Sequence, residues 1–508
     1  MLLVLSTSAL MGENMMSMII HPERGIGWIT LGSSLHGVLT RLKAQPMVYP
    51  KIDLCYSTED PVRDPIVIQL PANGLRLRFD GPDQRLRLIE IIDFSKTIFT
   101  YKNIDLVKKP SNSMGHEASP EGPSFQHLYK RLFGPSYAGE YIPPSNGALE
   151  GTYILSYPGL AVRFYLKHRS WSAKADFVAL LSSSAASATT SIAVFQGASW
   201  PEACKNLNTA IPKLPRSMSL AGRNADLVAD EVEEVAVHQG GRIELSRRVL
   251  SPFTIRLGTT TPQDLVAELG PPDSVYRKPV AGIAVRAGST ANGYEPTPSS
   301  LHDNQTVEHG YTSGRSYTDE SDNDGGGPDE ATNSTSMSEA FYNYFHHGFD
   351  VLIQSSREIF SSAHTPDGHD VTADFVVTKV FLHGNVPGSF SFNRHRRCRW
   401  RILIHGDNET EPLTSEQSFT HIQSSLRKVF ENRHSNLEEE VRTQRGMVLN
   451  RGWGESPESS IELLGGFEEG PQRSRLEDDL ASNTQLFGFP GMLFEVMKND
   501  SIVCLTLY

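Results

Sequence analysis

A short strand pattern recurs four times along the chain, and it constrains the fold more than any other feature of the sequence. Each copy begins with a glycine, which is followed by apolar residues at alternate positions, as in Gly74–Phe79. The other copies begin at Gly159, Gly348 and Gly491. Alternation with a period of two is typical of a strand with one buried face. The glycine suits a tight turn before the strand, because positive φ costs it nothing.

A second apolar segment follows each copy, so each glycine-led strand is expected to pair in a hairpin or meander. These segments are Leu86–Ile92, Ile192–Phe195, Val376–Leu382 and Ile502–Leu507. Upstream of each hairpin, apolar residues three and four positions apart indicate a short helix that covers one sheet face. The four helix candidates begin at Leu35, Phe125, Leu265 and Thr414.

The third candidate helix has the clearest end signals. Thr260 or Thr261 before Pro262 is typical of an N-cap followed by a proline in the first helical position. Gly270 and Pro271 just beyond Leu269 are stop signals. We therefore predict an α+β fold of about four repeated helix-plus-antiparallel-strand units.

The predicted units lie at 19–108, 122–200, 231–402 and 403–508. Residues 1–18 are expected to form an N-terminal extension, and 205–230 a linker. Segments 286–338 and 431–482 are polar and cannot bury enough apolar surface to offset chain ordering, so we expect disordered inserts there. Such inserts in the third and fourth units are tolerable because the entropy cost of loop closure grows slowly with length.

Charge and cysteine usage exclude several classes of protein. The formal net charge is −12, which argues against a nucleic-acid binder. The four cysteines are far apart and form no CxxC pair, so neither a zinc site nor a disulfide framework is expected. Their spacing favours a reducing compartment. The sequence has no apolar run of about 18 residues that would form a membrane-spanning helix.

No catalytic constellation is recognisable in the sequence. The phosphate loop, the nucleophile elbow and the zinc-protease motif are all absent. His346, His347 and His383 have no carboxylate or thiol at ligand spacing, so they are expected to be ordinary surface or turn residues. We predict neither an enzyme nor a metal or cofactor. A hydrolase in which His346 and His383 converge with carboxylates stays open, as does a carrier of a small ligand.

Four carboxylates lie on or near the first predicted hairpin. A paired general acid and base would need convergence that spacing cannot show. They are expected to be solvated strand or turn residues: Asp80, Asp83, Glu90 and Asp93.

A run of basic residues is the most distinctive polar feature. The candidate membrane- or partner-binding residues are Arg394, Arg396, Arg397, Arg399 and Arg401. Within a strand, the last three would project from one face, opposite Cys398, Trp400 and Ile402. This face either receives phospholipid headgroups or an acidic partner, or it is a solvated face paired with local acids.

Several motifs in chain order resemble one known family. They are His21–Gly25, Gly74–Phe79 with Gln84–Leu86, Phe133–Pro135, Leu269–Pro272, Asn343–Phe345, His383–Gly388, Phe392–Asn393, His395–Cys398, Gly491–Met497 and Val503–Tyr508. Together they resemble the phagophore (phagosome) assembly factor family, a long-uncharacterised eukaryotic group, over roughly residues 19–508.

The resemblance implies a cytosolic protein that is recruited peripherally to the preautophagosomal structure, where autophagosomes form. It implies an adaptor that acts with a β-propeller autophagy protein and with phosphoinositide-containing membranes. Traffic from the trans-Golgi to the plasma membrane is an alternative role that the resemblance also implies. No catalytic residues are known for the family, so none is carried over to this chain.

Overall fold

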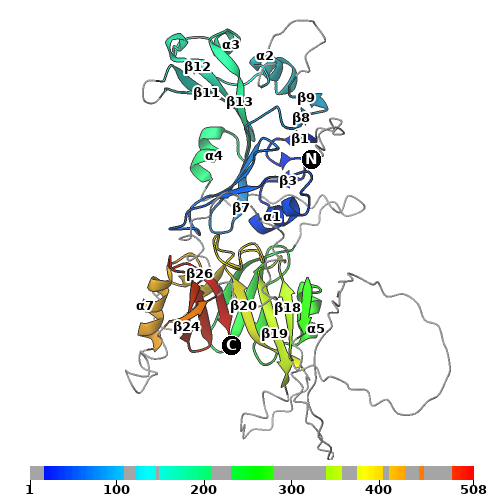
Figure 1. Ribbon diagram of the computed structural model, residues 1–508, viewed down its shortest axis with the longest axis vertical. Coiled ribbons are helices and arrows are strands. Elements are labelled where there is room, and N and C mark those ends of the chain that lie inside the picture. The colour runs from blue at the N-terminus through cyan, green and yellow to red at the C-terminus, as the bar shows by residue number, and fades with distance from the viewer. Residues whose placement is uncertain are drawn as a thin grey trace, which may run out of the picture.

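The computed structural model describes residues 16–107, 122–144, 148–207, 230–277, 339–356, 375–403, 411–430, 446–450 and 483–508. Within these ranges the strands form four sheets, two of five strands and two of eight. One sheet of each kind lies in an N-terminal half (16–207), and one of each in a C-terminal half (230–508). Figure 1 shows the two halves stacked along the long axis of the molecule.

The N-terminal half contains short helices beside long strands. Its first part comprises β1 (Ser17–His21), β2 (Gly25–Ile26), β3 (Ile29–Thr30), α1 (Leu35–Lys43), β4 (Asp53–Cys55), β5 (Ile66–Leu70), β6 (Leu75–Asp80) and β7 (Arg85–Ile91). Its second part comprises β8 (Ile98–Tyr101), β9 (Ile104–Asp105), α2 (Phe125–His127) with a π-helical turn (Leu128–Leu132), β10 (Glu140–Ile142), β11 (Glu150–Tyr157), β12 (Leu160–Lys167), a 3-10 turn (His168–Ser170), α3 (Phe177–Leu181), β13 (Ala186–Val194) and α4 (Trp200–Asn206).

The C-terminal half has a similar order of elements. Its first part comprises β14 (Val232–Val237), β15 (Arg242–Arg247), β16 (Phe253–Arg256), α5 (Pro262–Leu269), β17 (Ser274–Arg277), β18 (Glu339–Tyr344), β19 (Phe349–Ser355) and β20 (Phe375–His383). Its second part comprises β21 (Trp400–Ile402), β22 (Leu413–Thr414), α7 (Phe419–Phe430), β23 (Met447–Asn450), β24 (Asn483–Phe489), β25 (Met492–Val496) and β26 (Ile502–Leu507).

The strand orders of the two halves correspond. The eight-stranded sheets run β10-β11-β12-β13-β7-β6-β5-β4 and β17-β18-β19-β20-β26-β25-β24-β23. In each, two antiparallel meanders meet at their last strands. The five-stranded sheets run β3-β2-β1-β8-β9 and β16-β15-β14-β21-β22, with one parallel pair in the middle of each. The predicted α+β class is confirmed, whereas the fourfold repeat stays a prediction.

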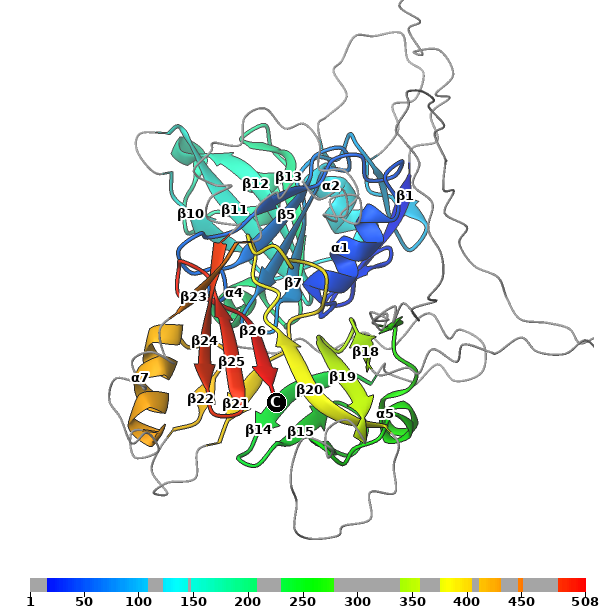
Figure 2. The ribbon, with the colours of Figure 1, turned by 60° about the horizontal axis from the view of Figure 1, so that its bottom comes forward.

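Each half has its own hydrophobic core on one face of its eight-stranded sheet. Leu35 and Leu39 of α1 belong to the core that also contains Leu75 and Leu77 of β6. Figures 1 and 2 both show α1 beside β7 of the same sheet. In the second core, Ile422 of α7 joins side chains from both sheets of its half. The predicted amphipathic helices therefore cover sheet faces as expected.

The glycine signal of the sequence is confirmed. Gly74, Gly159, Gly348 and Gly491 have φ of 68°, 71°, 91° and 76° and directly precede β6, β12, β19 and β25. At Gly348 a Cβ atom would lie 2.4 Å from the backbone oxygen of Arg396. The turn therefore requires glycine for its dihedral angle and for the close approach of a neighbouring segment.

The predicted cap of the third helix is also confirmed. Thr261 is the N-cap of α5, with Pro262 in the first helical position. The Thr261 hydroxyl accepts a hydrogen bond from the Asp264 backbone N–H, and the Asp264 carboxylate accepts one from the backbone N–H of Thr261. This reciprocal arrangement satisfies two donors that the first turn of a helix leaves unpaired.

Four local expectations need correction. The fourth helix begins at Phe419 and not at Thr414, because Leu413–Thr414 forms β22 against β21. The basic segment is a strand only from Trp400 onwards. Met447–Asn450, inside the predicted insert 431–482, forms β23 on an edge of the second large sheet. Ser17, inside the predicted extension, already begins β1. The insert predicted at 286–338 lies outside the described residues.

Candidate functional site

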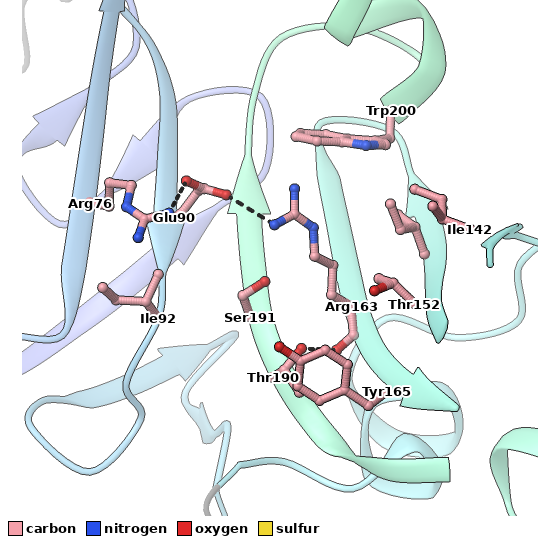
Figure 3. A pocket seen from close by; sticks show the side chains of 11 residues that line it. Arg76, Glu90, Ile92, Ile142, Thr152, Arg163, Tyr165, Thr190, Ser191 and Trp200 are labelled. Carbon is pink, nitrogen blue, oxygen red and sulfur yellow. Dashed lines mark hydrogen bonds and ion pairs between the residues drawn. The ribbon is translucent and has the colours of Figure 1, made fainter. Parts of the chain in front are cut away.

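A groove of about 400 Å³ crosses the face of the N-terminal eight-stranded sheet that is opposite its main core (Figure 3). Period-two alternation creates this face, because Leu75 and Leu77 of β6 point into the core while Arg76 and Arg78 point away from it. Trp200, the first residue of α4, covers one side of the groove.

Charged side chains from three strands converge in this groove. The Glu90 carboxylate of β7 lies between two guanidinium groups, 3.5 Å from Arg76 Nη1 and 3.5 Å from Arg163 Nη1. The Arg163 guanidinium also lies 5.4 Å from the centroid of the Trp200 ring. One carboxylate between two arginines leaves a net positive groove, and such a groove can accept an anionic group.

Most of the first-hairpin carboxylates that were expected to be solvated are buried or paired with arginines. Asp80 and Glu90 are buried. The Asp80 carboxylate is paired with Arg78, whose Nε donates at 2.9 Å, and Asp83 is paired with Arg87 at 2.9 Å. In the expected turn position, Asp93 accepts a hydrogen bond from the backbone N–H of Ser95 at 2.8 Å.

A second polar site joins the two halves of the molecule. Its central group is the Glu231 carboxylate, which contacts three arginines: Arg85 at 2.5 Å, Arg248 at 2.9 Å and Arg396 at 2.9 Å. Burial raises the pKa of Glu231, but Arg396, Arg85 and Arg248 outweigh this effect and lower that pKa to about 2. Because Arg85 belongs to the N-terminal half, this ion-pair cluster links the halves.

Hydrogen bonds extend this junction. Asn385 Nδ2 donates to Gln84 Oε1 at 2.8 Å, and Gln84 Nε2 donates to the Asn385 backbone oxygen at 3.0 Å. Farther out, Asn499 Nδ2 donates to the Thr58 backbone oxygen at 2.8 Å. Most of these groups satisfy one another away from solvent, so the junction has a defined geometry.

Two of the five predicted basic residues, Arg396 and Arg397, lie in this junction. Arg397 is buried, and its guanidinium donates to the backbone oxygens of Pro82, Gly384 and Ser415 at 2.7, 2.6 and 2.9 Å. Arg396 is buried as well and donates to the backbone oxygen of Val232 in addition to its ion pair. These two side chains are directed into the protein and do not form an exposed basic face.

The other three predicted basic residues are not all buried, and each has different surroundings. Arg399 pairs with Glu416 at 2.8 Å, and Arg401 pairs with Glu234 at 3.3 Å. Arg394 is exposed. The structure thus contains the pairing with local acids that was one interpretation of this segment. Membrane or partner binding by these residues stays a prediction.

Two of the three singled-out histidines also have partners that sequence spacing did not reveal. His383 Nε2 lies 2.9 Å from Asp350 Oδ2, and His395 Nε2 lies 2.8 Å from Asp350 Oδ1. The exposed His346 pairs instead with Asp273 at 2.7 Å. His346 is an exposed turn residue, as expected, whereas the contact of His383 with Asp350 was not visible in the sequence spacing.

The third singled-out histidine, His347, lies in a turn as expected, but its side chain is buried. His347 Nδ1 accepts a hydrogen bond from the backbone N–H of Val232 at 3.3 Å, which requires that nitrogen to be unprotonated. None of the side chains that line the groove is a histidine. The convergence that a hydrolase would need, with His346 and His383 in one pocket, is not found among the described residues.

Comparison with known proteins assigns the chain to a family. The family model for phagosome assembly factor 1 matches residues 25–300 and 326–508. The chain belongs to the phagosome assembly factor 1 family. No solved structure matches the chain.

Relatives within the phagosome assembly factor 1 family extend over nearly the whole chain. A PHAF1 protein of Arabidopsis thaliana is 23% identical over 499 residues, which cover 96% of this chain and 92% of the relative. A PHAF1 protein of Drosophila melanogaster is 22% identical over 517 residues, covering 97% and 94%. The match to this family supports a role in phagosome assembly and therefore in autophagy. Among the described helices, none has both the length and the apolar character to cross a membrane.

Proposed function

We propose that this chain is a non-enzymatic adaptor that acts where autophagosomes form, together with a β-propeller protein and phosphoinositide-containing membranes. The observation that carries the proposal is the family match, which covers both halves of the molecule. The matching strand orders of the two halves support the further proposal of four repeated units. Such an arrangement provides a rigid scaffold with several exposed sheet edges and faces.

The groove is the part of the scaffold best suited to a phosphorylated headgroup. Arg76 and Arg163 share one carboxylate at 3.5 Å, so an incoming phosphate can compete for both guanidinium groups. In contrast, Arg396 already forms an ion pair with Glu231, and Arg397 already donates hydrogen bonds to backbone oxygens inside the protein. We therefore propose the groove, and not the buried Arg396 and Arg397, as the direct lipid contact.

Liposome flotation of the purified full chain tests the lipid part of this proposal. Wild type is expected to float with liposomes that contain phosphatidylinositol 3-phosphate. With liposomes that lack this lipid, it is expected to remain in the bottom fraction of the gradient. The double variant Arg76→Gln/Arg163→Gln is expected to lose flotation. The matched control Arg242→Gln changes a half-exposed arginine of β15, 3.2 Å from Glu244, and is expected to float like wild type.

Two outcomes separate the parts of the proposal. If wild type does not float, direct lipid binding is wrong, and recruitment would require the protein partner. The partner is tested by pull-down of a purified autophagy β-propeller with the full chain. Cells that lack this protein should form fewer autophagosomes on starvation, and unchanged numbers would contradict the adaptor role itself.

A further inference from the structure

Three side chains from separate segments of the C-terminal half converge on one point. Asp350 lies on β19, His383 ends β20, and His395 belongs to the segment between β20 and β21. Their potential ligand atoms, one from each residue, all lie within 4.8 Å of one another. The imidazole rings of His383 and His395 are stacked with centroids 3.8 Å apart, so both Nε2 atoms face the same carboxylate.

We propose that Asp350, His383 and His395 form a binding site for one divalent transition-metal ion of the Zn²⁺ class. Two imidazole nitrogens and one carboxylate oxygen are the ligand set of many zinc and non-haem iron sites, whereas Mg²⁺ and Ca²⁺ prefer oxygen ligands throughout. Zinc binds such ligands at about 2.0–2.2 Å. Because the two rings are stacked with an interplanar angle of 14°, they must rotate so that both Nε2 lone pairs, which lie in the ring planes, point at one ion beside the carboxylate.

The surroundings of the three ligands favour a real site over a chance cluster. The His395 side chain is buried, and its ring is held by the Nε2 contact to Asp350 and by packing against Phe345. Cys504 of β26 lies opposite His383 in the sheet and is hydrogen-bonded to that ring. A neighbour of this kind fixes the orientation of a ligating imidazole.

The ion would fasten the junction segment to the sheet. His395 directly precedes Arg396 and Arg397, which reach Glu231 and the backbone oxygen of Pro82. A metal ion bridging His395 and Asp350 would therefore restrain the segment that carries Arg397, whose guanidinium contacts the N-terminal half at Pro82. A metal ion at this site would therefore have a structural role. Its removal should loosen the junction between the halves before either hydrophobic core unfolds.

Metal content of the full chain tests the proposal. The protein is prepared without a histidine tag, stripped with a chelator, loaded with Zn²⁺ and desalted, and its zinc is measured by mass spectrometry. Wild type is expected to retain about one equivalent. Asp350→Asn and His395→Gln are expected to bind zinc at least 100-fold more weakly. The control His346→Gln, which alters the nearby exposed His346–Asp273 pair, is expected to retain the ion.

Several results would overturn the site. Folded wild type that retains no zinc shows that the three side chains form only a hydrogen-bonded cluster. Folded variants that retain as much zinc as wild type place the ion elsewhere. Wild type loaded with Co²⁺ gives a test that does not depend on any variant folding. Visible absorption bands of protein-bound cobalt are expected, and a spectrum like that of the aqueous ion would contradict the proposal.

Discussion

The side-chain amides of Gln84 and Asn385, which are 301 residues apart in the chain, are hydrogen-bonded at 2.8 Å inside the molecule. Both residues have positive φ, 50° and 45°. Gln84 presents its amide from the turn at 81–84, and Asn385 from the segment that directly follows β20. Because both side chains are buried, neither can exchange its partner for water.

The first prediction concerns this amide pair. Replacing either residue with glycine keeps the left-handed backbone accessible but leaves the other buried amide short of a partner, which costs about 1–3 kcal/mol. In Gln84→Gly/Asn385→Gly the two losses should be less than additive, because the shared hydrogen bonds can be lost only once. Thermal unfolding of the four proteins measures this coupling. Strict additivity would mean that the amides do not interact.

The second prediction compares two glycines that both have positive φ. At Gly348 (φ 91°) a Cβ would meet backbone atoms of the 394–399 segment, whereas at Gly240 (φ 79°) nothing lies within 4 Å. Gly240→Ala should therefore cost only the left-handed penalty of about 1–2 kcal/mol. Gly348→Ala should cost clearly more, since the junction segment must move. Equal losses of thermal stability would show that the close approach does not matter.

The third prediction concerns the buried guanidinium of Arg397. Arg397→Lys keeps the charge but cannot donate to three backbone oxygens in the planar geometry of a guanidinium, so we expect a loss of about 2–3 kcal/mol. The matched control is Arg394→Lys at the exposed Arg394, which should be neutral. Chemical denaturation of each variant checks this. An Arg397→Lys protein as stable as wild type would show that the three hydrogen bonds of the Arg397 guanidinium do not contribute to stability.

The fourth prediction concerns pH. Burial lowers the pKa of His347 to about 3, with further lowering by His346 and Arg396 against opposing effects of Glu231 and Asp273. Since the folded pKa lies below the ordinary value of 6.5, the folded state holds this ring neutral. Its contribution to stability is complete above pH 6.5 and is lost as the pH falls towards 3, about 2 kcal/mol of it between pH 7 and 5.

A variant isolates this contribution. Asn can supply an oxygen near the position of the imidazole Nδ1, which accepts from the Val232 N–H, but it does not titrate. Thermal unfolding at a series of pH values should thus show a smaller loss of stability for His347→Asn than for wild type between pH 7 and 5. Equal slopes would assign the pH dependence to other groups.

Local sequence patterns allowed the prediction of single elements. The alternation in Gly74–Phe79 predicted a buried-face strand, and Thr261 with Pro262 predicted the start of α5; both were confirmed. These signals are reliable because strand pleating, helix capping and glycine dihedral angles depend on residues that are neighbours in the chain. The signals failed where a partner decided the outcome, as at Leu413–Thr414, which pairs with β21.

The candidate sites could not be read from sequence in the same way. His383 and His395 are 33 and 45 residues from Asp350, and Arg397 is 315 residues from Pro82. The only hint was an aspartate inside the apolar strand that begins at Phe349. No spacing rule predicts such contacts, because they follow from how two sheets and two halves pack.

The sequence by itself therefore determined the α+β class, the glycine turns, the cap of α5 and, through its family motifs, the family. Only the tertiary structure decided that Arg396 and Arg397 face inwards to Glu231 and Pro82, and that Asp350 lies between two histidines. The physical reason is that backbone conformation is set by near neighbours in the chain, whereas the burial and pairing of a charge depend on distant segments.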